Sequence, residues 1–217
     1  MSVSAEFARA TQAAAWLKLR WPTVGVRELL VFLLVVQVTA NAKLFTVGLG
    51  PSGFAAVCAG LALVIYGGAL HGKRVAARSA LGWITAPGRY WLGAAAAGCS
   101  LGPLVTTATI AFGHSIHVTE PFHSRVLAVT LGPIVEEMCL RGVMVPLLAR
   151  LIGSAGAILV TSAVFAFLHW PASLLKLGSI GATGASYGWI RVRSGSTALA
   201  AVAHTIYNLT VLTFGSS

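Results

Sequence analysis

Long apolar segments recur along the chain, separated by short polar stretches. About 20 apolar residues in a helix cross the hydrocarbon of a bilayer, and the pattern predicts seven such helices. They are expected at Glu28–Phe45, Gly53–Leu70, Tyr90–Phe112, Ser124–Arg150, Ser154–His169, Lys176–Ile190 and Thr197–Phe214. The fifth and sixth are short and could span only partly. The predicted fold is an all-α, polytopic transmembrane bundle of about seven helices.

Composition supports a membrane location. Of the 217 residues, 57% are hydrophobic and only 9% are charged, whereas about a quarter are charged in a typical soluble domain. Too few charges remain to cover a water-facing surface. We therefore expect a single membrane domain over residues 1–217, with residues 1–27 as an N-terminal cytoplasmic segment.

The net charge of +10 does not indicate nucleic-acid binding, because the basic residues cluster at the ends of apolar segments. That distribution sets membrane orientation. With the N-terminus inside, eleven basic residues fall on the cytoplasmic side and three on the other. The eleven are Arg9, Lys18, Arg20, Arg27, Lys73, Arg74, Arg78, Arg89, Arg150, Arg191 and Arg193, and the three are Lys43, Arg125 and Lys176. We expect an integral protein of a bacterial plasma membrane with a cytoplasmic N-terminus.

Two adjacent carboxylates, Glu136 and Glu137, interrupt the fourth apolar segment. A charge at the centre of a membrane helix costs about 3 kcal/mol even on mild scales, so such residues usually serve a function. On a helix, Glu137 and Arg141 lie one turn apart and can pair, whereas Glu136 points about 100° away. We expect Arg141 to hold Glu137 ionised as a positioning group and to leave Glu136 freer to exchange protons. The alternative is a purely structural role, in which the buried ion pair only holds helices together.

Three further polar residues interrupt the later helices. His169 ends the fifth helix, with Phe165 one turn earlier on the same face. His204 and Asn208 are one turn apart on the seventh helix and face the same space. Each alone could be an interfacial residue or interhelical hydrogen-bonding partner. Together with the glutamate pair, they predict an active site within the membrane.

These segments resemble the motifs of the CPBP family, the CAAX protease and bacteriocin-processing (Abi) intramembrane proteases. The family pattern is EExxxR, FxxxH and HxxxN in that order, and this chain has EEMCLR (136–141), FAFLH (165–169) and HTIYN (204–208). GASYGWIRVRSGS (184–196) also looks like the glycine-rich helix of the family. The resemblance covers residues 124–212, which are expected to be the catalytic helices.

The resemblance implies an intramembrane endopeptidase that hydrolyses a peptide bond of a membrane-associated protein or peptide. Glu136 would activate water, and His169 would help to position or deprotonate it. His204 and Asn208 would complete the catalytic set by stabilising the oxyanion. Glu137, Arg141 and Phe165 would position the site.

Metal dependence stays open at this stage. Glu136, His169 and His204 are also a plausible zinc set, because a catalytic zinc takes three protein ligands and a water. No metal ligand is assigned, since Asn208 is better suited to donating a hydrogen bond than to binding zinc. Zinc is the one cofactor the residues could hold.

Two non-proteolytic functions are alternatives to the protease: metal binding or transport, and immunity. The first draws on His114, His117, Glu120 and His123, which are spaced by three. The full motif set argues against a member that lacks activity. No clear inverted repeat supports a transporter.

The predicted orientation also bears on the substrate. If the fourth helix enters from outside near Ser124, Glu136 lies roughly 18 Å deep at about 1.5 Å per residue. His169 would lie near the outer end of its helix, so the site would open outward. This predicts a secreted or membrane-anchored substrate in place of a cytosolic prenylated one.

Overall fold

A computed structural model of the protein describes residues 81–84, 86–111, 122–169 and 173–214. Within those ranges the ordered elements are helices and no strand is present, which confirms the all-α class. The predicted helices Glu28–Phe45 and Gly53–Leu70 lie outside the described residues. So do residues 1–27 and the loop residues His114, His117 and Glu120.

The described helices follow the predicted apolar segments closely. They are α5 (Gly88–Ala111), α6 (Phe122–Val129), α7 (Leu131–Glu137), the π-helix η1 (Met138–Met144), α8 (Val145–Leu168), α9 (Leu174–Ser194) and α10 (Thr197–Phe214). The predicted segment Ser124–Arg150 is thus made of four successive pieces, including a π-helix that periodicity alone does not reveal.

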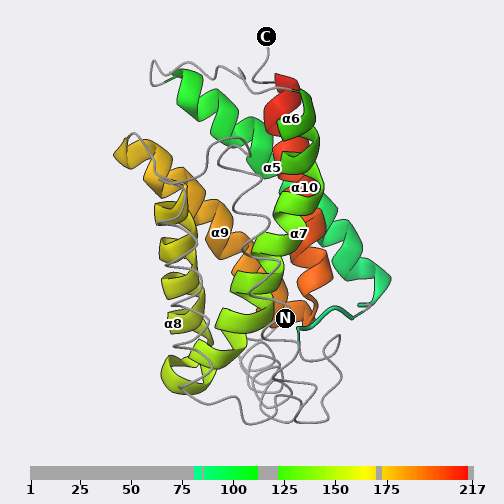
Figure 1. Ribbon diagram of the computed structural model, residues 1–217, viewed down its shortest axis with the longest axis vertical. Coiled ribbons are helices and arrows are strands. Elements are labelled where there is room, and N and C mark those ends of the chain that lie inside the picture. The colour runs from blue at the N-terminus through cyan, green and yellow to red at the C-terminus, as the bar shows by residue number, and fades with distance from the viewer. Residues whose placement is uncertain (1–80, 85, 112–121, 170–172, 215–217) are drawn as a thin grey trace, which may run out of the picture.

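A sharp turn at Gly153 divides α8. Its φ of 76° and ψ of 166° fall in a region that is essentially restricted to glycine. No heavy atom lies within 4 Å of the place where a β-carbon would be, so the backbone angle, not space, requires glycine here. The chain runs down through η1 to this turn and then returns along α8 (Figure 1). The turn lies where the fourth and fifth predicted helices were separated.

Two helix pairs have the most extensive packing among the described elements. α5 packs along α10, and α8 packs along α9 (Figure 1). Gly184 and Gly188 lie where α9 meets α8, and small residues at this four-residue spacing let helices approach closely. A β-carbon on Gly188 would lie 3.2 Å from Ile158, and one on Gly184 would lie 3.3 Å from the Cα of Ser162.

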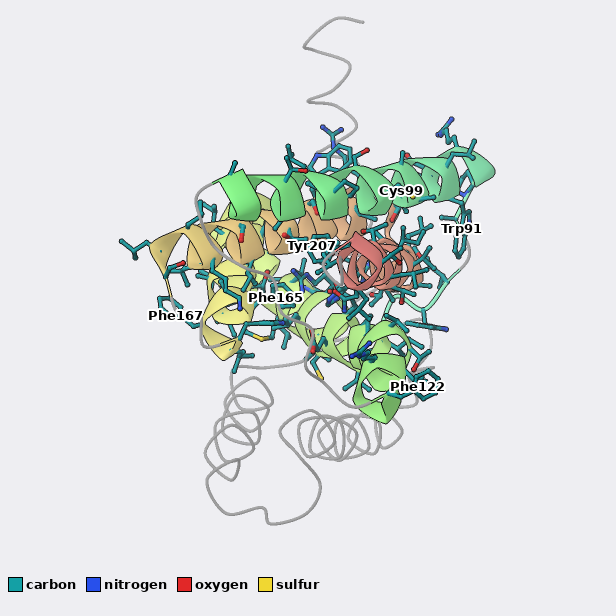
Figure 2. All side chains as sticks on the ribbon, turned by 90° about the horizontal axis from the view of Figure 1, so that it is seen from above. Trp91, Cys99, Phe122, Phe165, Phe167 and Tyr207 are labelled. Carbon is teal, nitrogen blue, oxygen red and sulfur yellow. The ribbon has the colours of Figure 1, made fainter. Side chains whose placement is uncertain are left out.

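The bundle has a hydrophobic core, yet it also exposes large apolar side chains and buries several polar and charged ones. The exposed apolar residues include Leu92, Leu159 and Leu174. Figure 2 shows the contrast on a single helix, where Phe165 lies inside the bundle and Phe167 lies at its edge. The buried polar set is Glu137, Arg141, Thr161, Ser162, Thr183, Arg191, Ser196, Thr197 and His204.

One stretch is apolar and long enough to cross a membrane by length and composition, namely Gly132–Leu168. Thr197–Thr213 is a shorter apolar helix. Both statements apply to the described residues of the chain. A single such stretch is compatible with the predicted membrane bundle without fixing its number of spans.

The π-helix has a local cause in Pro146. In a continuous α-helix the N–H of residue 146 would donate to Gly142 O, but proline has no N–H and its ring crowds that carbonyl. The chain widens instead, and the Val145 N–H donates to Leu140 O, five residues back. π-Helical segments are rare and occur frequently at functional sites.

Candidate active site

Glu137 is the centre of a buried charged cluster. Its side chain is 0% exposed, and its Oε1 lies 3.1 Å from Arg141 Nη1. The same oxygen lies 3.1 Å from His204 Nδ1 on α10. The predicted pairing of Glu137 with Arg141 is therefore confirmed as a contact. The bond to His204 gives Glu137 a second partner that helical spacing could not reveal.

Arg141 connects this cluster to α9. Its Nη2 donates to Gly184 O over 2.6 Å, and its Cζ lies 4.9 Å from the centroid of the Phe165 ring and 5.5 Å from that of Tyr187. Both distances allow cation–π attraction. A β-carbon on Gly184 would lie only 3.0 Å from Phe165 Cδ1 and 3.1 Å from Arg141 Nη2, so the site requires glycine there.

His204 is held at one edge by a hydrogen bond and on its faces by aromatic rings. A carboxylate can only accept a hydrogen bond, so Nδ1 donates to Glu137, and in the neutral form of the ring Nε2 carries no proton. The His204 ring stacks on Tyr187 at 4.8 Å and 22°, and it meets the Phe165 ring edge-on at 5.5 Å. Nε2 faces Glu136, whose Oε2 is 4.0 Å away.

The two glutamates have different environments. The Glu136 side chain is 41% exposed, whereas the Glu137 side chain is 0% exposed. The 4.0 Å between Glu136 Oε2 and His204 Nε2 is too long for a direct hydrogen bond. Part of the Glu136 side chain is therefore exposed, although the Oε2 that faces His204 is buried without a hydrogen-bond partner among the described residues, and Glu137 lies within the cluster.

His169 lies at the C-terminal end of α8. Its Nδ1 donates to Phe165 O over 2.7 Å, because a carbonyl oxygen can only accept a hydrogen bond. Its ring centroid is 4.5 Å from that of Phe165. Phe165 also contacts His204, so the phenyl ring contacts both histidines.

Asn208 lies one turn beyond His204 on α10 and is half-buried. The contacts described above join Glu136, Glu137, Arg141, Phe165, His169 and His204. Asn208 shares the helix of His204.

Sequence reasoning missed Tyr187. This residue is 0% exposed, stacks on His204 and lies under Arg141. The available signal was a single aromatic residue between Gly184 and Gly188 on an otherwise small-residue helix. Its contact with His204 depends on how α9 meets α10, and one sequence does not encode that contact in any visible pattern.

The described residues do not form a ready metal centre. No group of three or more His, Cys, Asp or Glu side chains among them is arranged to hold a metal ion. Glu136, His169 and His204, the alternative zinc set, therefore do not form such a group. We derive no step through a metal.

The fold and the cluster define an all-helical protein with a carboxylate–histidine–arginine site among apolar helices. Residues 118–210 match a protein-family model described as type II CAAX prenyl endopeptidase Rce1-like. The matched residues carry all three motifs, and the match agrees with the resemblance to the CAAX protease (CPBP) family. Proteins of this family are integral membrane proteases. Searches of curated proteins and of solved structures gave no significant match.

Proposed function

We propose that the protein is an intramembrane endopeptidase in which Glu136 activates the water that attacks a peptide bond. One observation carries the proposal. Glu137 Oε1 contacts both Arg141 and His204, while the more exposed Glu136 faces His204 Nε2 at 4.0 Å. One carboxylate therefore orients the imidazole, and the other is available for proton transfer.

The separation of Glu136 and His204 fits a bridging water. A water between Glu136 Oε2 and His204 Nε2 would donate one hydrogen bond to each atom. Glu136 takes a proton as the water oxygen bonds to the carbonyl carbon, and this forms a tetrahedral oxyanion. Glu136 then passes the proton to the leaving nitrogen as the C–N bond breaks.

The oxyanion requires hydrogen-bond donors. Neutral His204, bound through Nδ1–H to Glu137, has no proton on Nε2 to donate. The Asn208 carboxamide can donate, and we assign it the main oxyanion role. We assign His169 the positioning of the water or the peptide from the end of α8. This refines the family-based expectation that His204 and Asn208 share the oxyanion.

The exposed apolar surface supports placing this chemistry in a membrane. As one straight helix, the 37 residues of Gly132–Leu168 would extend about 55 Å, against about 30 Å of hydrocarbon. The turn at Gly153 divides the stretch into two antiparallel arms. We propose that each arm crosses the bilayer, so that Glu136 and His169 lie on neighbouring walls of one site.

Two observations point to different substrates. The description of the matching family model names a prenylated CAAX chain. The start of α5, the turn at Gly153 and the end of α9 lie away from the end of α8 (Figure 1). Arg89, Arg150 and Arg193 are next to those three points in the sequence, and basic ends favour the cytoplasm. By that rule the His169 end faces outward, toward a secreted or membrane-anchored protein. The substrate class common to both is a membrane-associated protein or peptide.

Cleavage by the full chain in lipid nanodiscs tests the proposal. The probes are a fluorogenic farnesylated CAAX peptide and a fluorogenic peptide with an unprenylated apolar tail. Wild type is expected to cleave at least one, and Glu136→Gln to cleave neither. Equal cleavage by Glu136→Gln would show that the base is another residue. Failure of wild type on both probes would favour a non-proteolytic immunity or transport role, and activity lost to a chelator and restored by zinc would establish a metal mechanism.

A further inference from the structure

Arg191 is a buried charge outside the expected site. Its side chain is 1% exposed, so it does not act as one of the cytoplasmic surface charges that the topology count assumed. Its hydrogen bonds go to main-chain carbonyls. Nε donates to Arg141 O over 3.0 Å, and Nη1 donates to Gly195 O. Burying a charge is costly, so these bonds need an explanation.

The Arg141 carbonyl is free for Arg191 because of the π-helix. Its α-helical donor would be the Val145 N–H, which instead donates to Leu140 O. Its π-helical donor would be the N–H of residue 146, and Pro146 has none. The guanidinium of Arg191 thus satisfies a buried carbonyl that local sequence leaves without a helical donor.

The surrounding backbone is built to fit this guanidinium. Gly82 has a φ of +67°, and a β-carbon there would lie 2.5 Å from Arg191 Cζ. The segment that contains Gly82 is tied down by Thr197, whose N–H donates to Gly82 O over 2.8 Å and whose Oγ1 donates to Leu81 O over 2.6 Å. Gly142 completes the enclosure, since a β-carbon on it would lie 2.9 Å from Leu81 O.

We propose that Arg191 is a positioning residue for the active site, acting through the main chain of Arg141. Arg141 connects Arg191 to the site through its main chain on one side and its side chain on the other. The Arg141 carbonyl accepts from Arg191, and the Arg141 side chain holds Glu137, which in turn orients His204. Arg191 fixes where the π-helix places Arg141, and so sets the Nδ1–Glu137 bond that leaves His204 Nε2 facing Glu136. The effect on catalysis rests on the proposed function, whereas the effect on His204 does not.

The first test compares Arg191→Met with Arg193→Met in nanodiscs. Arg193 lies on the same helix with its guanidinium over the Trp189 ring, so it is a matched control. Mutating the residues that orient metal ligands typically costs about 10–100-fold in affinity or activity, and we take this as the scale for an orienting group. We expect that loss in kcat for Arg191→Met, with KM changed less than about twofold, and near-wild-type values for Arg193→Met. Arg191→Lys keeps the positive charge but not the planar guanidinium with its several donors, so it should lose less activity than Arg191→Met.

The second test needs no protease activity. In protein labelled with ¹⁵N-histidine, the His204 signals are assigned as those lost in His204→Gln. Wild type should show a protonated Nδ1 and an unprotonated Nε2. Arg191→Met should move both signals toward the average of exchanging tautomers, and Arg193→Met should leave them unchanged. If wild type cleaves neither probe but these signals move, the positioning role stands and the protease proposal fails.

A third comparison tests whether Arg191 acts through the Arg141 carbonyl. Pro146→Ala restores an N–H that can bond within the helix, so Arg191→Met should perturb the His204 signals less in that background than alone. Should Arg191→Met fail to fold, Arg191→Lys carries the same comparison. Wild-type kcat together with wild-type His204 signals in Arg191→Met, or an undiminished effect in the Pro146→Ala background, overturns the proposal.

Discussion

His204 donates through Nδ1 to Glu137 across 3.1 Å, and both side chains are buried. The second carboxylate of the pair therefore orients an imidazole in addition to holding an arginine. Histidines at reactive centres are commonly held in this way, because the bond at one nitrogen fixes which lone pair the other presents. The predictions below test how much of the site depends on this arrangement.

Glu136→Gln and Glu137→Ala should fail in different ways. Glu136 is 41% exposed, so Glu136→Gln should remove activity while leaving the unfolding transition near that of wild type. Glu137→Ala leaves the buried Arg141 without its carboxylate, which costs about 3–5 kcal/mol in comparable buried pairs. Cleavage rates and thermal unfolding in nanodiscs separate the two. Similar unfolding temperatures for both variants would contradict the assigned roles.

Phe165 should matter more than its exposed neighbour on the same helix. It is 3% exposed and touches His169 and His204, whereas Phe167 is 65% exposed (Figure 2). Truncating a buried phenylalanine to alanine typically costs about 3–5 kcal/mol. We expect Phe165→Ala to lose both stability and cleavage, and Phe167→Ala to retain both. Chemical unfolding and the peptide assay measure the difference.

Gly184 and Gly181 form a matched pair on α9. A methyl group on Gly184 would press on Phe165 and Arg141 at 3.0 and 3.1 Å, while one on Gly181 would lie 3.9 Å from Ala166 Cβ. Overpacking of this kind typically costs about 1–3 kcal/mol. Gly184→Ala should therefore be destabilised and slow, and Gly181→Ala should match wild type in both assays. Equal behaviour would mean that α9 can move away from the site without cost.

Tyr187 should act through its ring. Its hydroxyl is buried without a hydrogen-bond partner among the described residues, so removing it should cost little stability. Its ring stacks on His204. Tyr187→Phe is expected to cleave at nearly the wild-type rate, and Tyr187→Leu to lose most activity. A large loss in Tyr187→Phe would indicate that the hydroxyl binds a water or the substrate.

The part of the fold that local patterns determine was predictable. Apolar runs and their polar interruptions located the described helices, and the i, i+4 spacing anticipated the contact of Glu137 with Arg141. Periodicity assumes regular α-helix, so it could not show that Pro146 converts the segment at Arg141 into a π-helix.

Contacts between distant segments were beyond the reach of one sequence. Arg191 reads as a cytoplasmic surface charge because it ends an apolar run, yet it is buried against a carbonyl fifty residues earlier. The contacts of Tyr187 and of the segment around Gly82 also join residues that are far apart in the sequence. Their roles follow from the way α9, α10 and the π-helix meet.

Gly153 has a consequence for the membrane arrangement proposed above. If both arms cross the bilayer, the backbone angle at Gly153, which other residues rarely adopt, sets the membrane side of the end of α8 and of His169. A β-carbon there would have no other side chain within 4 Å. If a substitution straightened the chain, the helix would carry His169 away from Glu136 toward the opposite leaflet. In that arrangement, a residue that takes no part in the chemistry determines the side of the membrane to which the site opens.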